Sequence, residues 1–303
     1  MVIDEAAAIK KIVWEQYLRP TLSDRQGWCL MTSTPRGYNW LFDLYERGQD
    51  DDFPEWESWQ HPSHESPYFK DDIKELKRTL TLETYLQEYE SQFTSFTGKV
   101  YPFIHSTHVV PGLKYNPKLE TFISIDFGFR MPAVGFYNVK RNEEGKDTIY
   151  QFDEICHEEN IKTEDLIDKI LQKKYKVDAY YGDPAGGGVQ SQSGISEIQQ
   201  FARRGIFVRT RSDTASRNIV NGVNHVRSWF EDANGDAHFF VSDKCKGSIQ
   251  SYDNYRYPEK KEDQRIKEEP LKDGRSDHMN DATRYLCVNV FPIKRNIAGV
   301  IDW

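Results

Sequence analysis

The chain has 303 residues, of which 29% are charged, and a formal net charge of −8. No apolar run approaches the roughly 18 residues that span a bilayer, and Asp4 and Glu5 interrupt the stretch where a secretion signal would lie, so we expect a cytoplasmic protein. The acidic balance argues against a protein that simply coats nucleic acid, but it permits an enzyme with one basic groove.

Two zones of different composition divide the chain, and its length allows a domain for each. Residues 1–95 predict a strand end, a helix, a second strand and further helices. The segment 96–119 is rich in Gly, Pro, Ser, Thr and His, and predicts a linker that leads into the next strand. From residue 120 to 303, predicted strands alternate with predicted helices.

Acidic residues follow the first predicted strand. "VIDEAA" (2–7) ends an apolar strand at Asp4 and Glu5, and "GWCLMTSTPRG" (27–37) is a second apolar strand that runs into a polar loop. A parallel sheet that hydrolyses nucleotide phosphates needs this order of an Asp for magnesium, a Glu for the attacking water and a neighbouring polar sensor. The simpler interpretation is a strand followed by an acidic helix start. The sequence contains no GxxxxGK[ST] phosphate loop, so we do not expect this chain to hydrolyse ATP.

The second zone opens with "TFISIDFGFRMPAVGFYNV" (121–139), which predicts two strands paired as a hairpin, with Asp126 at the middle of the first. An acid rarely lies inside a buried strand unless a cation or another partner compensates its charge. After a predicted helix over 161–175, "VDAYYGDPAGGG" (177–188) predicts another strand, which ends in Asp183.

The remaining elements are predicted as a helix over 194–205, a strand over 206–211, a helix over 215–232, a strand over 237–243 and a charged, hairpin-like stretch over 253–275. "SDHMNDATRY" (276–285) then begins a helix. Asp277, His278 and Asp281 converge on one patch there, because residues three and four apart are neighbours on a helix. A simpler role for Ser276 or Asp277 is to cap the helix.

These acids can meet only if the strands that carry Asp126 and Asp183 are adjacent in one mixed sheet, with the last helix beside them. Carboxylate oxygens suit Mg²⁺ or Mn²⁺, and two such ions about 4 Å apart clamp a phosphodiester during hydrolysis. The pattern therefore predicts metal-dependent hydrolysis of a nucleic-acid backbone. His278 would be a further ligand or a proton shuttle, or it would only cap its helix.

Arginine side chains that could contact DNA phosphates are most frequent in the segment 202–218. The candidate residues are Arg203, Arg204, Arg209, Arg211 and Arg217. The alternative is that these arginines are scattered, solvated surface charges. The stretch 256–275 is a second candidate, although its many Glu residues weaken it.

Taken together, the motifs resemble the large terminase subunit of tailed bacteriophages, an ATP-driven motor that packages double-stranded DNA and cuts it. "VIDEAA" looks like its Walker B segment and "TSTPRG" like its coupling motif. "SIDFG", "YGDPAG" and "SDHMNDATRY" look like the three acidic motifs of its nuclease domain. The resemblance covers essentially the whole chain and implies an α/β fold, with an RNase H-like nuclease domain of a mixed sheet flanked by helices. A partial P-loop-type ATPase domain, with a lid at about 50–95, would precede it.

The resemblance also implies roles for single residues. The ATPase site would include Asp4, Glu5, Thr32, Ser33 and Arg36, and the nuclease metal ligands would be Asp126, Asp183 and Asp281, with Asp277 and His278 as accessory residues. The implied cofactors are two Mg²⁺ or Mn²⁺ ions, with ATP only in a full-length motor. Implied partners are double-stranded DNA, the portal protein and the small terminase subunit, in an oligomeric ring in the host bacterial cytoplasm. Because the family carries its phosphate loop before the Walker B strand, we expect this chain to lack an N-terminal part.

Two other functions remain open. The chain would be a catalytically silent coupling or assembly module if it only contacted the portal and the small terminase, but such a module has no need for Asp126 inside a strand. A sugar-kinase-like sheet would use "DFG" (126–128) and the glycine run to bind phosphate, yet it needs a second Asp-containing hairpin and a longer chain.

Overall fold

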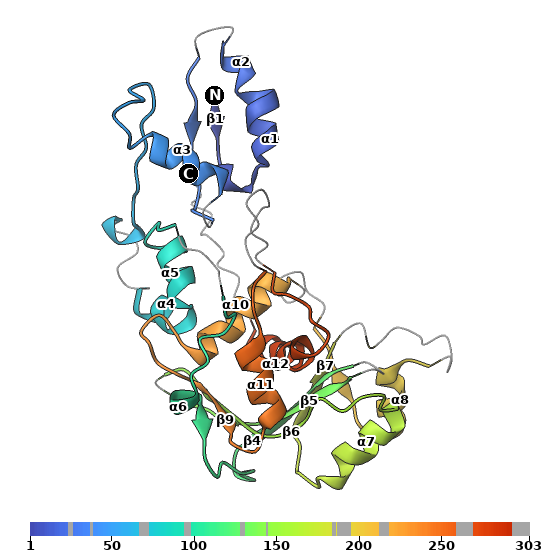
Figure 1. Cartoon of the computed structure of the whole chain (residues 1–303). Coiled ribbons are helices and arrows are strands. Elements are labelled where there is room, and N and C mark those ends of the chain that lie inside the picture. Colours follow the sequence, from blue (N-terminus) through green and yellow to red (C-terminus); the bar gives the residue numbers. More distant parts are fainter. Residues whose placement is uncertain are drawn as a thin grey trace, which may run out of the picture.

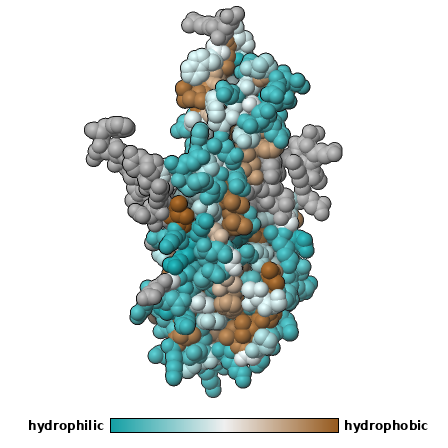
Figure 2. Space-filling view, turned by 90° about the vertical axis from the view of Figure 1, so that its left-hand side faces the viewer, coloured by the Kyte–Doolittle hydropathy of each residue, from teal (hydrophilic) through white to brown (hydrophobic). Residues whose placement is uncertain are grey.

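We describe a computed structural model of the chain, which covers residues 1–23, 27–36, 39–66, 73–93, 98–127, 131–143, 145–183, 186, 195–211, 218–258 and 269–292. A small N-terminal unit lies above a larger unit that is built around one sheet (Figure 1). Hydrophilic residues cover most of the face shown in Figure 2, and the hydrophobic residues there form small groups. Within the described ranges, no helix has both the length and the apolar composition that a membrane crossing requires.

The N-terminal unit is organised by two short parallel strands, β1 (Val2–Ile3) and β2 (Leu30–Met31). Its helical segments are η1 (Ala6–Ala8), α1 (Lys11–Val13), η2 (Trp14–Leu18), α2 (Pro20–Ser23) and α3 (Trp40–Arg47). The rings of Trp14 and Trp40 stack with their centroids 6.4 Å apart, and both side chains are buried with Ile3. This tryptophan pair joins the segments before and after β2.

The helices α4 (Ile73–Thr79) and α5 (Leu82–Glu88) pack beside α10 (Ile219–Phe230) of the larger unit (Figure 1). The short 3-10 helix η3 (Ser63–Glu65) precedes them. The amide of Ala233 donates to the carbonyl oxygens of Lys77 and Leu80, at 2.9 and 3.0 Å. Arg227 of α10, which is buried, pairs with Glu83 of α5 at 2.7 Å. Backbone and charge contacts therefore attach these helices to the larger unit.

The larger unit contains a seven-stranded sheet with the strand order β3-β9-β6-β5-β4-β7-β8. Its strands are β3 (Val109–Val110), β4 (Glu120–Asp126), β5 (Ala133–Lys140), β6 (Thr148–Ile155), β7 (Ala179–Gly182), β8 (Val208–Arg209) and β9 (Phe239–Ser242). The pairs β4–β5 and β5–β6 are antiparallel and the other pairs are parallel. The mixed sheet flanked by helices is confirmed, as is the hairpin at its start.

Helices cover both faces of this sheet (Figure 1). Because successive side chains of a strand point to opposite faces, Ile123 and Ile125 of β4 face α7 (Thr163–Gln172) and α8 (Glu197–Arg203). Phe122 and Ser124 face the opposite way. That second face is covered by α10, α11 (Lys246–Asn254) and α12 (Ser276–Val290).

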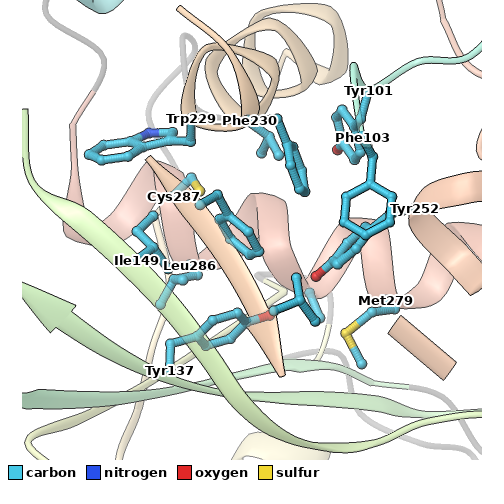
Figure 3. Packing of buried hydrophobic residues seen from close by; sticks show 14 of the residues in the cluster. Tyr101, Phe103, Tyr137, Ile149, Trp229, Phe230, Tyr252, Met279, Leu286 and Cys287 are labelled. Carbon is cyan, nitrogen blue, oxygen red and sulfur yellow. The ribbon is translucent and has the colours of Figure 1, made fainter. Parts of the chain in front are cut away.

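The core on the α12 side is rich in aromatic rings (Figure 3). Phe230, which is fully buried, has ring centroids of Tyr101, Phe239 and Tyr252 within 4.7 to 5.2 Å. Tyr101 and its buried neighbour Phe103 come from the segment 96–119, which we predicted to be a linker. This segment instead contributes to the core, because its aromatic side chains fill space between α10 and α11.

The elements β6 and α11 were not predicted from the sequence. The sequence of α11 contains Gly, Ser and Asn, which are weak helix formers. A tertiary contact compensates, because the Glu154 carboxylate of β6 accepts from the amides of Gly247 and Ser248 at 2.9 and 2.6 Å. These amides are in the first turn of α11, where an anion is favoured.

Candidate active site

The helix α12 is fixed over the sheet by buried hydrogen bonds. The Ser124 hydroxyl of β4 donates to the carbonyl oxygen of Ala282 at 2.6 Å. The hydroxyl groups of Tyr137 and Tyr252 lie 3.2 and 2.8 Å from Thr283 Oγ1. Polar groups this deeply buried are costly to leave unpaired, so these contacts specify one register and one rotation of α12. The residues at the start of α12 are thereby directed toward the ends of β4 and β7.

Asp126 is the last residue of β4, not its middle as we predicted, and it lies on the same face as Ser124. The residue is 7% exposed, and its Oδ2 accepts a hydrogen bond from His278 Nδ1 at 2.8 Å. This bond joins the end of β4 to the first turns of α12. The structure therefore brings together two acidic motifs that are 152 residues apart in sequence.

Asp183 and Asp281 complete a cluster of acids around Asp126. Asp183 directly follows β7, the parallel neighbour of β4, and Asp281 lies one turn beyond His278. Burial is the main cause that raises the pKa of Asp126 to about 7; the charges of Asp281 and Asp183 act in the same direction, whereas His278 opposes them. The hydrogen bond to Asp126 raises the pKa of His278. The four side chains therefore interact electrostatically, and the cluster favours additional positive charge.

Asp277 has different neighbours. Burial raises the pKa of its carboxyl group, and the nearby charges belong to His278 and Asp273. The N-cap residue of α12 is Arg275, whose side chain makes no capping hydrogen bond. Just upstream, Asp273 Oδ1 accepts from the amides of Arg275 and Ser276 at 2.9 and 2.6 Å. The suggestion that Ser276 or Asp277 caps the helix is wrong, because the helix begins at Ser276 and its cap lies upstream.

Arg284 was not predicted as a site residue from the sequence. It is 6% exposed, and its Nε and Nη2 both donate to Asp281 Oδ1, at 3.1 and 2.8 Å. An Asp and an Arg three positions apart on a predicted helix would have signalled this pair.

In the N-terminal unit, Asp4 contacts the polar loop that follows β2. Thr32 Oγ1 donates to Asp4 Oδ1 at 2.6 Å, and the Ser33 hydroxyl accepts from the amide of Ala7 at 3.1 Å. Glu5 has a left-handed backbone with φ of 53° and an exposed side chain. Arg36 is also exposed. The structure therefore joins the strand-tip acid to the polar loop.

The candidate DNA-binding arginines do not form one cluster. Arg203 and Arg204 are at the end of α8, on the opposite face of the sheet from α12, and Arg204 pairs with Asp168 at 2.5 Å. Arg211 donates to the carbonyl oxygen of Val288 at 3.2 Å, which ties it to α12. Arg209 is exposed on the edge strand β8. Arg217 lies outside the described residues.

The donor set at the end of β4 fits a hard divalent cation. Carboxylate oxygens are the ligands that Mg²⁺ and Mn²⁺ prefer. Burial and the neighbouring acids disfavour a negative charge on Asp126, and a bound cation would offset this effect. In the described part of the chain, no three Asp, Glu, His or Cys side chains are arranged as a complete metal cluster. Mg²⁺ does not require one, because it keeps several waters and takes one or two protein carboxylates together with substrate phosphate.

Comparisons of sequence and structure identify similar proteins, although no protein-family profile matches the chain. The large terminase subunit of Escherichia phage T5 is 26% identical over 297 residues, which cover 94% of this chain and 64% of that protein. The large terminase subunit of Thermus virus P23-45 is 28% identical over 151 residues, which cover 42% of this chain and 31% of that protein. This chain therefore spans less than two thirds of either relative.

Among solved structures, the large terminase of a thermophilic bacteriophage matches with a TM-score of 0.66 and 19% sequence identity. The match covers 96% of this chain and 68% of the chain in that structure. A structure of the same thermophilic phage protein in complex with ATP-gamma-S gives a TM-score of 0.65. At this identity, the likeness establishes a shared fold over nearly the whole chain.

Proposed function

The chain belongs to the family of bacteriophage large terminase subunits, and on that premise we propose that its larger unit is a metal-dependent endonuclease that cuts double-stranded viral DNA during genome packaging. The observation that carries this proposal is the gathering of Asp126, Asp183, His278 and Asp281 at the carboxyl ends of two adjacent parallel strands. A module that only contacted other packaging proteins would have no use for two further acids and a histidine around a buried carboxyl group.

In the proposed reaction, Asp126, Asp183 and Asp281 would hold Mg²⁺ or Mn²⁺. Bound ions would supply Lewis acidity, which lowers the pKa of the attacking water and stabilises charge on the leaving oxygen. Asp126 fixes the ring of His278 through Nδ1, which leaves Nε2 to hold or pass a proton. Asp277 would be accessory, since its carboxyl group interacts with Asp273 and His278.

The proposal is tested with supercoiled plasmid DNA and the purified chain. With Mn²⁺ or Mg²⁺ we expect nicked and then linear DNA, and we expect EDTA to stop the reaction. Folded protein that cuts in none of these metals would favour the catalytically silent assembly module instead.

We propose that the chain contacts DNA through the phosphates and that Arg209 makes one of these contacts. Arg209 is exposed on β8, the edge strand next to β7. Arg209→Ala should weaken binding equally for unrelated DNA sequences and reduce the slope of log K against log salt by about one. The measurement is fluorescence anisotropy with labelled duplexes over a salt series.

Arg204→Ala is the matched control for this variant, because the Arg204 guanidinium already pairs with Asp168. We expect a smaller change in the salt slope. Equal salt slopes for Arg209→Ala and the parent chain would remove Arg209 from the phosphate contacts.

The N-terminal unit has a separate proposed role. Asp4, Glu5, Thr32, Ser33 and Arg36 would belong to an ATP site that acts only together with a phosphate loop, a motif that is absent from this sequence. The portal protein and the small terminase subunit are the proposed partners in an oligomeric motor. ATP is therefore proposed as a cofactor of the assembled motor and not of this chain alone.

A further inference from the structure

Arg284 forms a buried ion pair with one of the proposed metal ligands, Asp281, one turn before it on α12. The side chains of Arg284 and Asp281 are 7% and 13% exposed. A guanidinium often spans both oxygens of a carboxylate, but here Nε and Nη2 both donate to Oδ1. Neither bond uses Oδ2 of Asp281, so Arg284 does not occupy this oxygen.

The position of Arg284 is fixed from two further sides. Its aliphatic stem passes over Gly222 of α10, where a Cβ atom would lie only 2.7 Å from Arg284 Cδ and 2.9 Å from Cγ. The guanidinium carbon lies 4.5 Å from the ring centroid of Tyr285, at a cation–π distance. A glycine at position 222 is therefore required for this packing, and the guanidinium has little freedom to leave Asp281.

The pair also balances charge. Asp126, Asp183 and Asp281 are close enough to interact electrostatically, so three ionised carboxylates would repel one another before a cation binds. The buried guanidinium of Arg284 compensates part of this negative charge, and its two donors to Oδ1 restrict the rotation of the Asp281 carboxylate.

From this geometry we propose that Arg284 is a positioning residue for the metal site, which holds Asp281 in one orientation with Oδ2 presented to the ion. This inference rests on the metal-dependent function proposed above. Residues that orient metal ligands typically contribute about 10–100-fold to metal affinity, and we expect Arg284 to act within that range.

The test is Mn²⁺ binding to the full chain, measured by isothermal titration calorimetry without DNA. Arg284→Met keeps an apolar stem but removes the charge and both donors, and should weaken Mn²⁺ binding about 10–100-fold. Arg284→Lys keeps the positive charge but lacks the planar guanidinium with its two donors to Asp281, so its Mn²⁺ affinity should be intermediate. Gly222→Ala keeps Arg284 but displaces its stem, and should weaken binding several-fold.

Arg227→Met is the matched control, because Arg227 is also buried and also pairs with a carboxylate, Glu83, but belongs to the contact with α5. It should lower stability in urea and leave the Mn²⁺ affinity unchanged. An equal loss of Mn²⁺ affinity in Arg227→Met and Arg284→Met would overturn the proposal, because the effect would then be a general loss of packing.

The outcomes separate this inference from the function on which it rests. If the parent chain binds no Mn²⁺, the proposed function fails and the inference fails with it. If the parent binds Mn²⁺ and folded Arg284→Met binds equally tightly, only the role of Arg284 is overturned. Should Arg284→Met not fold, parent-like affinity in both Arg284→Lys and Gly222→Ala would overturn it.

Discussion

Asp183→Asn is expected to lower the rate of Mn²⁺-dependent plasmid cleavage by roughly two orders of magnitude or more. The substitution keeps the size of the side chain and removes the negative charge that follows β7, beside Asp126. Loss of one carboxylate weakens both the binding of the ion and the stabilisation of charge in the reaction. The measurement is the conversion of supercoiled DNA over time, with the thermal unfolding of the variant recorded in parallel.

Asp178→Asn serves as the control for this substitution. Asp178 lies at the opposite end of β7, where its carboxylate accepts from the amide of Thr121 at 2.8 Å. An amide oxygen can still accept that bond, so this variant should cut DNA at the parent rate. Parent-like cleavage by Asp183→Asn would remove Asp183 from the proposed metal site.

Phe230→Ala is expected to lower the free energy of unfolding by about 3–5 kcal/mol. Phe230 is fully buried, and the rings of Tyr101, Phe239 and Tyr252 pack against it, so its removal leaves a cavity that these rigid rings cannot fill. Figure 3 shows Phe230 with Tyr101 and Tyr252. Urea unfolding followed by tryptophan fluorescence measures the change.

Phe207→Ala is the corresponding control, because the Phe207 side chain is 72% exposed and should change stability by no more than about 0.5 kcal/mol. We also expect Phe230→Ala to make the segment around Tyr101 more susceptible to protease, since this segment packs on Phe230. A loss of less than about 1 kcal/mol in Phe230→Ala would contradict the described core.

Much of the fold follows from local patterns in the sequence. The hairpin of β4 and β5 was predicted because an apolar run, a glycine turn and a second apolar run are strong local signals. By contrast, β6 and α11 were not predicted. The start of α11 depends on Glu154, a residue of another strand, and such a tertiary cap has no local signal in the sequence.

The candidate site was also predictable from local sequence patterns only in part. Asp126 was identified because an acid is rare inside an apolar strand, and Asp183 because it follows an apolar run. Their convergence with α12 required adjacent parallel strands, which the structure contains. The bond between His278 and Asp126 depends on the rotation of α12, which is set by buried contacts such as Ser124 to Ala282. No pattern within the helix itself encodes that rotation.

The arginines of the segment 202–218 show that proximity in sequence does not predict a shared surface. Arg204 and Arg209 are close in sequence, but one pairs with Asp168 and the other is exposed on the edge of the sheet. Because side-chain partners come from distant elements, a run of arginines does not by itself define a DNA-binding surface.

The most direct test of the account is a crystal of the chain soaked in Mn²⁺ and measured for anomalous scattering. We predict peaks within coordinating distance of carboxylate oxygens of Asp126, Asp183 and Asp281. Manganese peaks that lie only elsewhere, with these carboxylates uncoordinated, would contradict the proposed metal centre.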